Sequence, residues 1–361
     1  MSSSFGMACV GISHPHVSVR LDVARRLEGV SVVGVSDPDP ANEEALIALS
    51  NYLDVPVLSV EHVLDDPAIH AVIVEPWTYE MVDTSIRCAE AGKHVLVEKP
   101  GGSNPQDIER LVEAAKRTGR VIQVGYNFRF SPIVEWVAEL LATGALGKIV
   151  QAQVHAAGPA GDSHYRWFNL PDDLGGCFWE DGCHIMDLIV HLFGPPKKVT
   201  AHISKFGSVS GVESQEDAVV AALEWDSMLM GFDFTSWEAN DWLETWQFNL
   251  YGTEGTLRFQ MLPERYELYL KEPKNGFQAG WTRWSETSFP TPWAGQPTPW
   301  EKWHIVANKS FFIRELTAFQ RACESGLASP IPPSHARTIA SVMQACYDSA
   351  RLSGRTIEVA P

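Results

Sequence analysis

Short apolar runs alternate with longer stretches of helical periodicity along the first third of the chain. The runs are rich in valine and isoleucine and lack the polar alternation of a strand with one solvated face. The runs lie at 7–11, 31–36, 71–74, 94–97 and 121–124, and the helical stretches at 16–27, 40–50, 78–91 and 105–118. Strands that alternate with helices form βαβ units, so this part predicts a parallel sheet covered on both faces.

A different pattern begins after about Gly125. Several of its strand candidates alternate apolar with polar residues, which is typical of an antiparallel sheet with two unlike faces. These candidates are 149–155, 199–204, 217–224, 229–236, 242–251 and 256–260, and helices are expected at 132–142, 174–193, 309–324 and 334–352. We therefore predict an α/β domain over 1–125 and an α+β domain over 126–361, whose closing helix can pack back on the first domain.

The segment 280–304 is rich in tryptophan and proline and has few aliphatic residues. It fits a loop packed by its own aromatic side chains. It fits equally an aromatic wall over a sugar-sized ligand, or an interface. Composition does not decide between these interpretations.

Composition and charge exclude several classes of protein. The chain has 361 residues and a formal net charge of −17, without the basic face that nucleic-acid binding needs. No stretch approaches the roughly 20 apolar residues of a membrane helix, and the first residues do not resemble a signal peptide. The six cysteines are scattered without CxxC pairs, which favours reduced thiols in the cytoplasm.

The first two strand ends carry the features of a dinucleotide site. Asp37 ends the second strand about 25 residues after Gly11, where a Rossmann unit places the carboxylate that binds the adenosine ribose. Such a carboxylate favours NAD(H) over NADP(H), although Asp37 also fits a simple turn acid. The loop between them reads GISHPH, with Ser13 and His16 where a fingerprint has its second and third glycines. Backbone N–H groups at a helix start still bind phosphate there.

Two further motifs carry candidate chemistry. The run GKHVLVEKP places Glu98 and Lys99 at the carboxyl edge of the predicted sheet, where ligands bind in open α/β folds, although a lysine at a loop tip is often only solvated. In the later motif, LGGCFWEDGCHIMDL, Glu180 and His184 are one helical turn apart, with Asp187 and His191 continuing the same face. An acid and a histidine so placed suit proton transfer, or form a buried polar face.

Three motifs in this order resemble the glucose–fructose oxidoreductase, inositol dehydrogenase and rhizopine catabolism family (Gfo/Idh/MocA). They are GKHVLVEKP, YNFRFSP at 126–132 and GGCFWEDGCHIMDLIVHLFG at 175–194. The resemblance implies a Rossmann domain followed by a domain built on a large, mostly antiparallel open sheet. It also implies association into a homodimer or homotetramer through that sheet.

The resemblance implies an NAD-dependent oxidoreductase acting on a secondary hydroxyl of a sugar, glycoside or polyol. Lys99 would hold the substrate oxygen, and His184, with Glu180 as partner, would take or give the hydroxyl proton. The positions expected to contact the cofactor are Gly11, Ser13, His14, His16, Asp37, Glu75, Pro76, Glu98 and Lys99. The positions expected to bind substrate are Lys99, Asn127, Arg129, Asp181 and His184.

Departures from the family pattern leave other functions open. Glu180 stands where the helix motif usually has aspartate, and Asp181 follows it directly. With the paired histidines of the opening loop, this allows a second hypothesis, in which His14, His16, Glu180 and His184 bind a divalent metal in a lyase or hydrolase. A third is a cofactor sensor without chemistry, against which the retention of both Lys99 and His184 argues.

Overall fold

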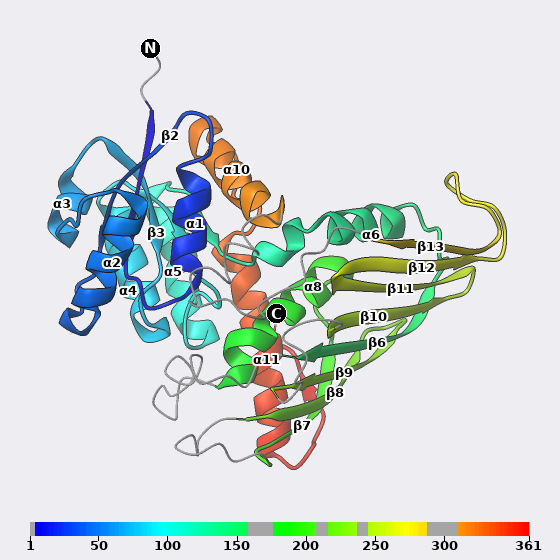
Figure 1. Ribbon diagram of the computed structural model, residues 1–361. Helices are drawn as coiled ribbons and strands as arrows, with labels where there is room; N and C mark the ends of the chain where they lie inside the picture. The colour runs from blue at the N-terminus through cyan, green and yellow to red at the C-terminus, as the bar shows by residue number, and fades with distance from the viewer. Residues whose placement is uncertain (1–3, 158–175, 207–215, 237–244, 287–309, 361) are drawn as a thin grey trace. The chain divides into compact units, whose positions relative to one another are not determined.

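The structure, a computed structural model, describes residues 4–157, 176–206, 216–236, 245–286 and 310–360 (Figure 1). The chain forms two compact units. The first contains the described residues up to Phe130 together with 310–337, and the second contains the described residues from Ser131 to 286 and those after Arg337. The first unit therefore includes a late part of the chain as well as its beginning.

A five-stranded parallel sheet is the centre of the first unit, in the order β2-β1-β3-β4-β5. Its strands are β1 (Phe5–Val10), β2 (Val30–Ser36), β3 (Ile69–Val74), β4 (His94–Val97) and β5 (Ile122–Val124). The helices are α1 (His16–Ala24), α2 (Glu43–Leu53), α3 (Val60–Asp65), α4 (Met81–Glu90), α5 (Pro105–Thr118) and α10 (Ser310–Ser325). Right-handed crossovers place α1 on one face of the sheet and α4 and α5 on the other. The predicted doubly wound sheet is confirmed, and α10 packs against α1.

A nine-stranded sheet dominates the second unit, in the order β13-β12-β11-β10-β6-β9-β8-β7-β14. Its pairs are antiparallel except β6 with β9, which confirms the predicted architecture. The strands are β6 (Ile149–Ala157), β7 (Lys198–Ser204), β8 (Ala218–Glu224), β9 (Leu229–Thr235), β10 (Thr245–Gly252), β11 (Gly255–Leu262), β12 (Glu264–Leu270), β13 (Gly280–Ser285) and β14 (Ile357–Glu358). The helices are α6 (Pro132–Ala142), α8 (Cys183–Phe193) and α11 (Pro333–Arg351), the last from Thr338 onwards.

The two faces of this large sheet differ as the alternating pattern predicts. On β8, Val219 is buried while its neighbour Val220 is 62% exposed. Aromatic contacts from Phe178 to Phe232 and Phe234 on β9 identify the buried face as the one that carries the helices of this unit. The opposite face presents its side chains to solvent.

Among the residues that the structure describes, three strands and one α-helix were not predicted from the sequence. The missed elements are α3, β12, β13 and β14. Strand β13 occupies the start of the tryptophan-rich segment that was expected to be a loop, and residues 287–304 of that segment lie outside the described residues. In the part of the chain that the structure describes, no helix combines the length and apolar character needed to cross a membrane.

Candidate active site

The carboxyl ends of the five parallel strands carry the candidate residues of the first unit. Each strand is followed by a loop at the same edge of the sheet, which is where open α/β folds bind ligands. In the order of the sheet, these loops contribute Asp37 after β2, 11–16 after β1, Glu75 and Pro76 after β3, Glu98 and Lys99 after β4, and Asn127 after β5. The structure therefore brings together, at one edge, candidates spread over more than a hundred residues of sequence.

The opening loop requires glycine at position 11. Gly11 has φ +87°, and a Cβ atom there would lie 2.3 Å from the backbone nitrogen of Pro76. The next N–H group, of Ile12, donates to Asp37 Oδ2 at 2.8 Å. This bond joins the expected phosphate loop to the expected ribose-binding carboxylate. The opposite oxygen of Asp37, Oδ1, accepts from the backbone N–H of Asp39 at 2.8 Å.

The remaining backbone N–H groups of the loop already donate hydrogen bonds to other groups of the protein. The N–H groups of Ser13 and His14 both donate to the carbonyl of Glu75, at 2.9 and 3.3 Å. Pro15 has no N–H, and the N–H of His16 donates to His14 Nδ1 at 3.2 Å. A glycine-rich loop leaves such donors free for a pyrophosphate. In this conformation the loop therefore offers few backbone N–H groups to a phosphate.

Behind the loop lies a fully buried group of charges, here called the Arg20 cluster: Arg20, Glu75, Glu98 and Glu315, with His14 and His16 beside them. Arg20 Nη1 lies 2.8 Å from Glu75 Oε1 and also contacts Glu98 Oε2. Arg20 Nε donates to Glu315 Oε2 on α10 at 3.0 Å. One guanidinium thus faces three carboxylates, all with fully buried side chains.

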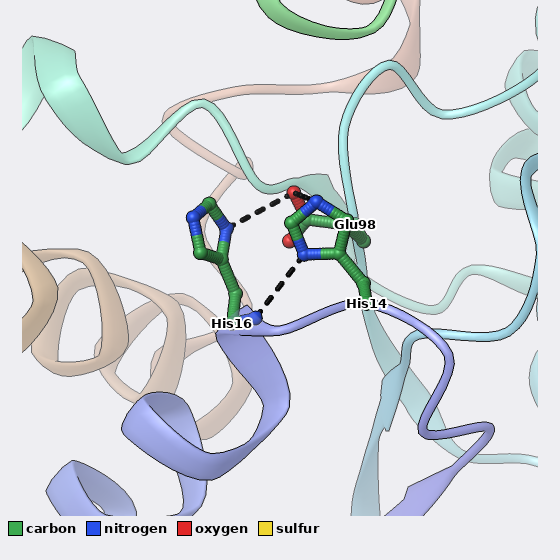
Figure 2. A group of neighbouring side chains, drawn as sticks. All are labelled: His14, His16 and Glu98. Atoms are coloured by element: carbon green, nitrogen blue, oxygen red, sulfur yellow. Dashed lines mark hydrogen bonds and ion pairs between the residues drawn. The ribbon is translucent and has the colours of Figure 1, made fainter. Parts of the chain in front are cut away.

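Both histidines of the loop point to the same oxygen of Glu98 (Figure 2). His16 Nδ1 lies 3.2 Å from Glu98 Oε1, and His14 Nε2 lies 3.7 Å from it. The other ring nitrogen of His14, Nδ1, lies 3.8 Å from Glu75 Oε2. Glu98 therefore has one oxygen on the guanidinium of Arg20 and the other between two imidazoles.

Burial shifts the protonation of this cluster in different directions. Burial raises the pKa of Glu75 to about 8, with Arg20 opposing and Glu98 reinforcing the shift. Burial would also raise the pKa of Glu98, but Arg20 and the two histidines outweigh it and hold that pKa well below its usual range. Burial lowers the pKa of His14 and of His16. The ionised form of Glu98 is therefore favoured, whereas burial favours the protonated forms of Glu75 and Glu315 and the neutral forms of both imidazoles.

Arg20 and Glu315 are the residues of this region that the sequence analysis missed. Arg20 lies in the helix HVSVRLDVA, every residue of which is buried, and Glu315 is fully buried in α10. A charged side chain in an apolar, buried helix needs a partner of opposite charge. That rule could have identified both residues as members of a buried ion pair.

Lys99, Asn127 and Arg129 are all buried in the first unit. The Asn127 side chain is 0% exposed, and neither its Oδ1 nor its Nδ2 has a hydrogen-bond partner within the described residues. Buried amides are almost always hydrogen-bonded, so the Asn127 amide can still bind water or a polar group of a ligand. Arg129 differs, because its Nη2 contacts His335 Nε2 in the same unit.

In the second unit, Gly176, the second glycine of the helix motif, makes room for a carboxylate. Glu216 Oε1 accepts from the N–H groups of Gly176 and Phe178, at 3.1 and 3.0 Å, and from Tyr347 Oη at 2.5 Å. A Cβ atom on Gly176 would lie 1.9 Å from Glu216 Oε2. Glu216, another residue missed from the sequence, thus fixes the start of the motif helix.

The motif helix begins with a π-helical turn, Phe178–Gly182, before α8. Such turns add a residue to the helical repeat and recur at functional sites. The candidate residues Glu180, Asp181 and His184 are buried, whereas His191 is exposed, so the single polar face expected from the spacing ends before the last turn. The ring centroids of Trp246 and His184 lie 5.9 Å apart. The backbone of Trp246 has a φ of +61°.

The alternative ligand set of the sequence analysis is divided between the units. His14 and His16 belong to the first unit, and Glu180 and His184 belong to the second. Within the first unit the carboxylate between the two histidines is Glu98, which had been assigned only to cofactor binding.

Known protein families match both units. A model of an oxidoreductase family with an NAD-binding Rossmann fold matches residues 5–126, and the model of the GFO/IDH/MocA C-terminal domain matches residues 134–258. Together they cover more than half of the chain, in the order that the motifs predict. The chain belongs to the GFO/IDH/MocA family.

Relatives of this family member include carbohydrate and polyol enzymes. It is 33% identical over 147 residues to scyllo-inositol 2-dehydrogenase (NADP(+)) of Bacillus subtilis, matching 41% of each chain. It is 27% identical over 235 residues to 1,5-anhydro-D-fructose reductase of Ensifer adhaerens, matching 65% of this chain and 69% of that one. The match to the first of these thus spans less than half of its length.

A solved structure of levoglucosan dehydrogenase with NADH and levoglucosan has the same fold as this GFO/IDH/MocA protein. The TM-score is 0.77 at 17% identity, and the alignment covers 99% of this chain and 100% of that one. The comparisons give no support to the metal-dependent lyase or hydrolase considered from the sequence.

Proposed function

We propose that the protein is an NAD(H)-dependent oxidoreductase that moves a hydride between the cofactor and a secondary hydroxyl or ketone of a sugar, glycoside or polyol. The observation that carries the proposal is the placement of Asp37 and Lys99 on strand ends at the ligand-binding edge of an NAD-binding Rossmann unit. The relatives named above support the substrate class. The nicotinamide, when bound, supplies the hydride chemistry.

The ribose end of the site suits the dinucleotide. Asp37 Oδ1 has one backbone donor and Oδ2 has two donors, Ile12 N and Asn42 Nδ2. A carboxylate offers about four acceptor positions, so capacity remains for a ribose hydroxyl. The negative charge repels a 2′-phosphate, which supports NAD(H) over NADP(H) as the preferred cofactor.

At the phosphate end, we expect the loop to bind the pyrophosphate more weakly than a glycine-rich loop does. Gly11 provides the turn, and the positions of Ser13, His14 and His16 remain the candidates to face the pyrophosphate. Because the N–H groups of the loop donate hydrogen bonds within the protein, cofactor binding must exchange some of those hydrogen bonds for hydrogen bonds to phosphate. Glu75, Pro76 and Glu98 line the same edge of the sheet.

On the substrate side, the proposal assigns binding to Lys99, Asn127 and Arg129 from the first unit. The ammonium of Lys99 would hold the substrate oxygen. The side-chain amide of Asn127 would donate one hydrogen bond to a polyhydroxylated ligand through Nδ2 and accept one from it through Oδ1. Alcohols and ketones of sugars present both kinds of group at neighbouring carbons.

From the second unit, the proposal assigns proton transfer to His184, with Glu180 as its partner and Asp181 as a further substrate contact. A neutral imidazole accepts the hydroxyl proton during oxidation and returns it during reduction. The buried setting of all three side chains supports this assignment, since water is kept from the proton path.

Replacing Lys99 with methionine tests the proposal. A panel of sugars, glycosides and polyols is first screened for NADH formation by the wild-type protein. With the substrate so found, Lys99→Met is expected to lower kcat/KM by about 100-fold or more, while NADH binding stays measurable by fluorescence titration. Lys116→Met, at an exposed lysine on α5, serves as the matched control and should retain wild-type turnover. Normal turnover by Lys99→Met would refute the assigned role.

The proposal also covers assembly and location. The exposed face of the nine-stranded sheet supports association with further copies of the chain as a homodimer or homotetramer. All six cysteines are free thiols, which supports a reducing compartment such as the cytoplasm.

A further inference from the structure

We propose that His14, His16 and Glu98 form a binding site for one divalent transition-metal ion, with Zn²⁺ as the best-suited ion. The site lies wholly within the first unit and goes beyond the proposed hydride transfer. One ligand atom from each residue lies within 4.8 Å of the others, and all three residues are buried. Two imidazoles and one carboxylate form a ligand set that zinc takes with a fourth position left open.

The spacing of the ligand atoms matches a metal centre. Zinc bonds of about 2.0–2.2 Å in tetrahedral geometry separate neighbouring ligand atoms by roughly 3.3–3.6 Å. In the structure, Glu98 Oε1 is 3.2 Å from His16 Nδ1 and 3.7 Å from His14 Nε2 (Figure 2). Small side-chain movements therefore suffice to admit an ion between the two rings and the carboxylate.

The surroundings hold the ligands as metal sites require. Ligating carboxylates are usually hydrogen-bonded themselves, and ligating histidines pass their second N–H to a carboxylate or carbonyl. Glu98 Oε2 contacts Arg20, which leaves Oε1 for the ion. Glu75 Oε2 lies 3.8 Å from His14 Nδ1 and has no hydrogen-bond partner within the described residues. That fully buried oxygen can accept the Nδ1–H of His14 when the other nitrogen of this imidazole binds the ion.

Charge supports the same conclusion. Three buried carboxyl groups surround one guanidinium, and when all three are ionised the cluster carries an excess of negative charge. Burying an uncompensated carboxylate is costly, and either protons or a cation must balance the excess. A divalent ion between the histidines and Glu98 supplies this positive charge without repelling neutral imidazoles.

The protons of the imidazoles must be placed consistently. For His14 to bind an ion through Nε2, its single proton must lie on Nδ1, where Glu75 Oε2 can accept it. The backbone N–H of His16, which points to His14 Nδ1 at 3.2 Å, then loses that acceptor. His16 binds through Nδ1 and carries its proton on Nε2. Metal binding thus exchanges one long backbone contact for two imidazole–metal bonds.

Metal binding to the full-length protein tests this site directly. After removal of metals with EDTA, the protein is titrated with Co²⁺, a spectroscopic substitute for Zn²⁺, and equilibrated separately with Zn²⁺ by dialysis. We expect one ion per chain, visible Co²⁺ absorption bands with nitrogen and oxygen ligands, and a rise in Tm on addition of Zn²⁺.

Variants locate the ion. His14→Gln and His16→Gln should each weaken Zn²⁺ binding by more than about 100-fold, since losses of 10- to 100-fold follow even from changes to the residues that support a ligand. His62→Gln, at an exposed histidine of α3, is the control and should bind as the wild type does. The Tm of the wild-type protein with and without Zn²⁺ provides a result that does not depend on the variants folding.

The absence of stoichiometric binding to the wild-type protein, or its survival in the His14→Gln/His16→Gln double variant, would overturn the proposed site. NADH titration of the EDTA-treated protein runs in parallel. NADH binding without metal binding rejects the metal site and leaves the oxidoreductase proposal standing, whereas metal binding without NADH binding does the reverse.

Discussion

In the proposed site, the carboxylate of Asp37 would bind both the loop and the ligand. It accepts the N–H of Ile12 and the amide of Asn42, so its side chain is held in place before any cofactor arrives. A preorganised acceptor loses little conformational entropy on binding. Its negative charge, rather than its shape, is expected to set the preference between the two nicotinamide cofactors.

Replacing Asp37 separates these two contributions. Asp37→Asn keeps one acceptor oxygen and removes the charge, so the ratio of NADPH to NADH affinity should rise by about tenfold or more, as expected for hydrogen bonds to charged groups. Fluorescence titration with each cofactor measures that ratio. Asp65→Asn, at an exposed acid in α3, should leave it unchanged. An unaltered ratio in Asp37→Asn would mean that Asp37 does not face the ribose.

At the scale of elements, a glycine in the opening loop and a glycine in the helix motif have the same role. Each makes room for a group from a distant part of the chain. Gly11 lies against Pro76, and Gly176 lies against the carboxylate of Glu216. In the second case the carboxylate binds two N–H groups at the start of the π-helical turn. The position of the helix that carries His184 thus depends on the absence of a side chain.

Gly176→Ala measures that dependence. The added methyl group would overlap Glu216 Oε2, and we expect a loss of about 1–3 kcal/mol in the free energy of unfolding, as for other overpacked sites. Gly231→Ala is the matched control, since no atom lies within 4 Å of its Cβ position on β9. Denaturant unfolding gives both values. In a Glu216→Ala background the cost of Gly176→Ala should shrink, and an undiminished cost would place the clash elsewhere.

The elements that the sequence predicts best are those whose side chains are buried along the whole element or along one face of it. The five strands of the first sheet and the helix Pro132–Ala142 were all expected, because their apolar residues face one environment. Strand β13, GWTRWS, begins the segment rich in tryptophan and proline, and that composition, with few aliphatic residues, does not predict a strand. The Arg20–Glu315 pair joins positions far apart in sequence, and no local pattern records such a contact.

For the molecule as a whole, the exposed face of the large sheet is the described surface at which we expect another copy of the chain to bind. Val220 and Leu229 on β8 and β9 are 62% and 50% exposed, and Trp281 on β13 is 45% exposed. Large apolar side chains on a sheet face favour burial against another surface. A second copy of the chain offers the same face, as a symmetric interface requires.

Charged substitutions on that face should change the state of assembly. Val220→Asp combined with Leu229→Asp is expected to convert a dimer or tetramer into smaller species, as measured by light scattering coupled to size-exclusion chromatography. Ile47→Asp, at a 49% exposed position on α2, is the control and should leave the mass unchanged. If the wild-type protein is a monomer, or if the double variant keeps the wild-type mass, the sheet face is not the interface.

The contact between Arg20 and Glu315 also limits when the first unit can finish folding during synthesis. The two residues are separated by 295 positions, and ribosomes add about 5–20 residues per second, so roughly 15–60 s pass between their appearance. From the completion of β5 until α10 is made, all five strands of the first sheet exist without this helix. The nascent first unit therefore holds an apolar helix face and a guanidinium without its final partners. Its folding can be completed only after α10 has been made.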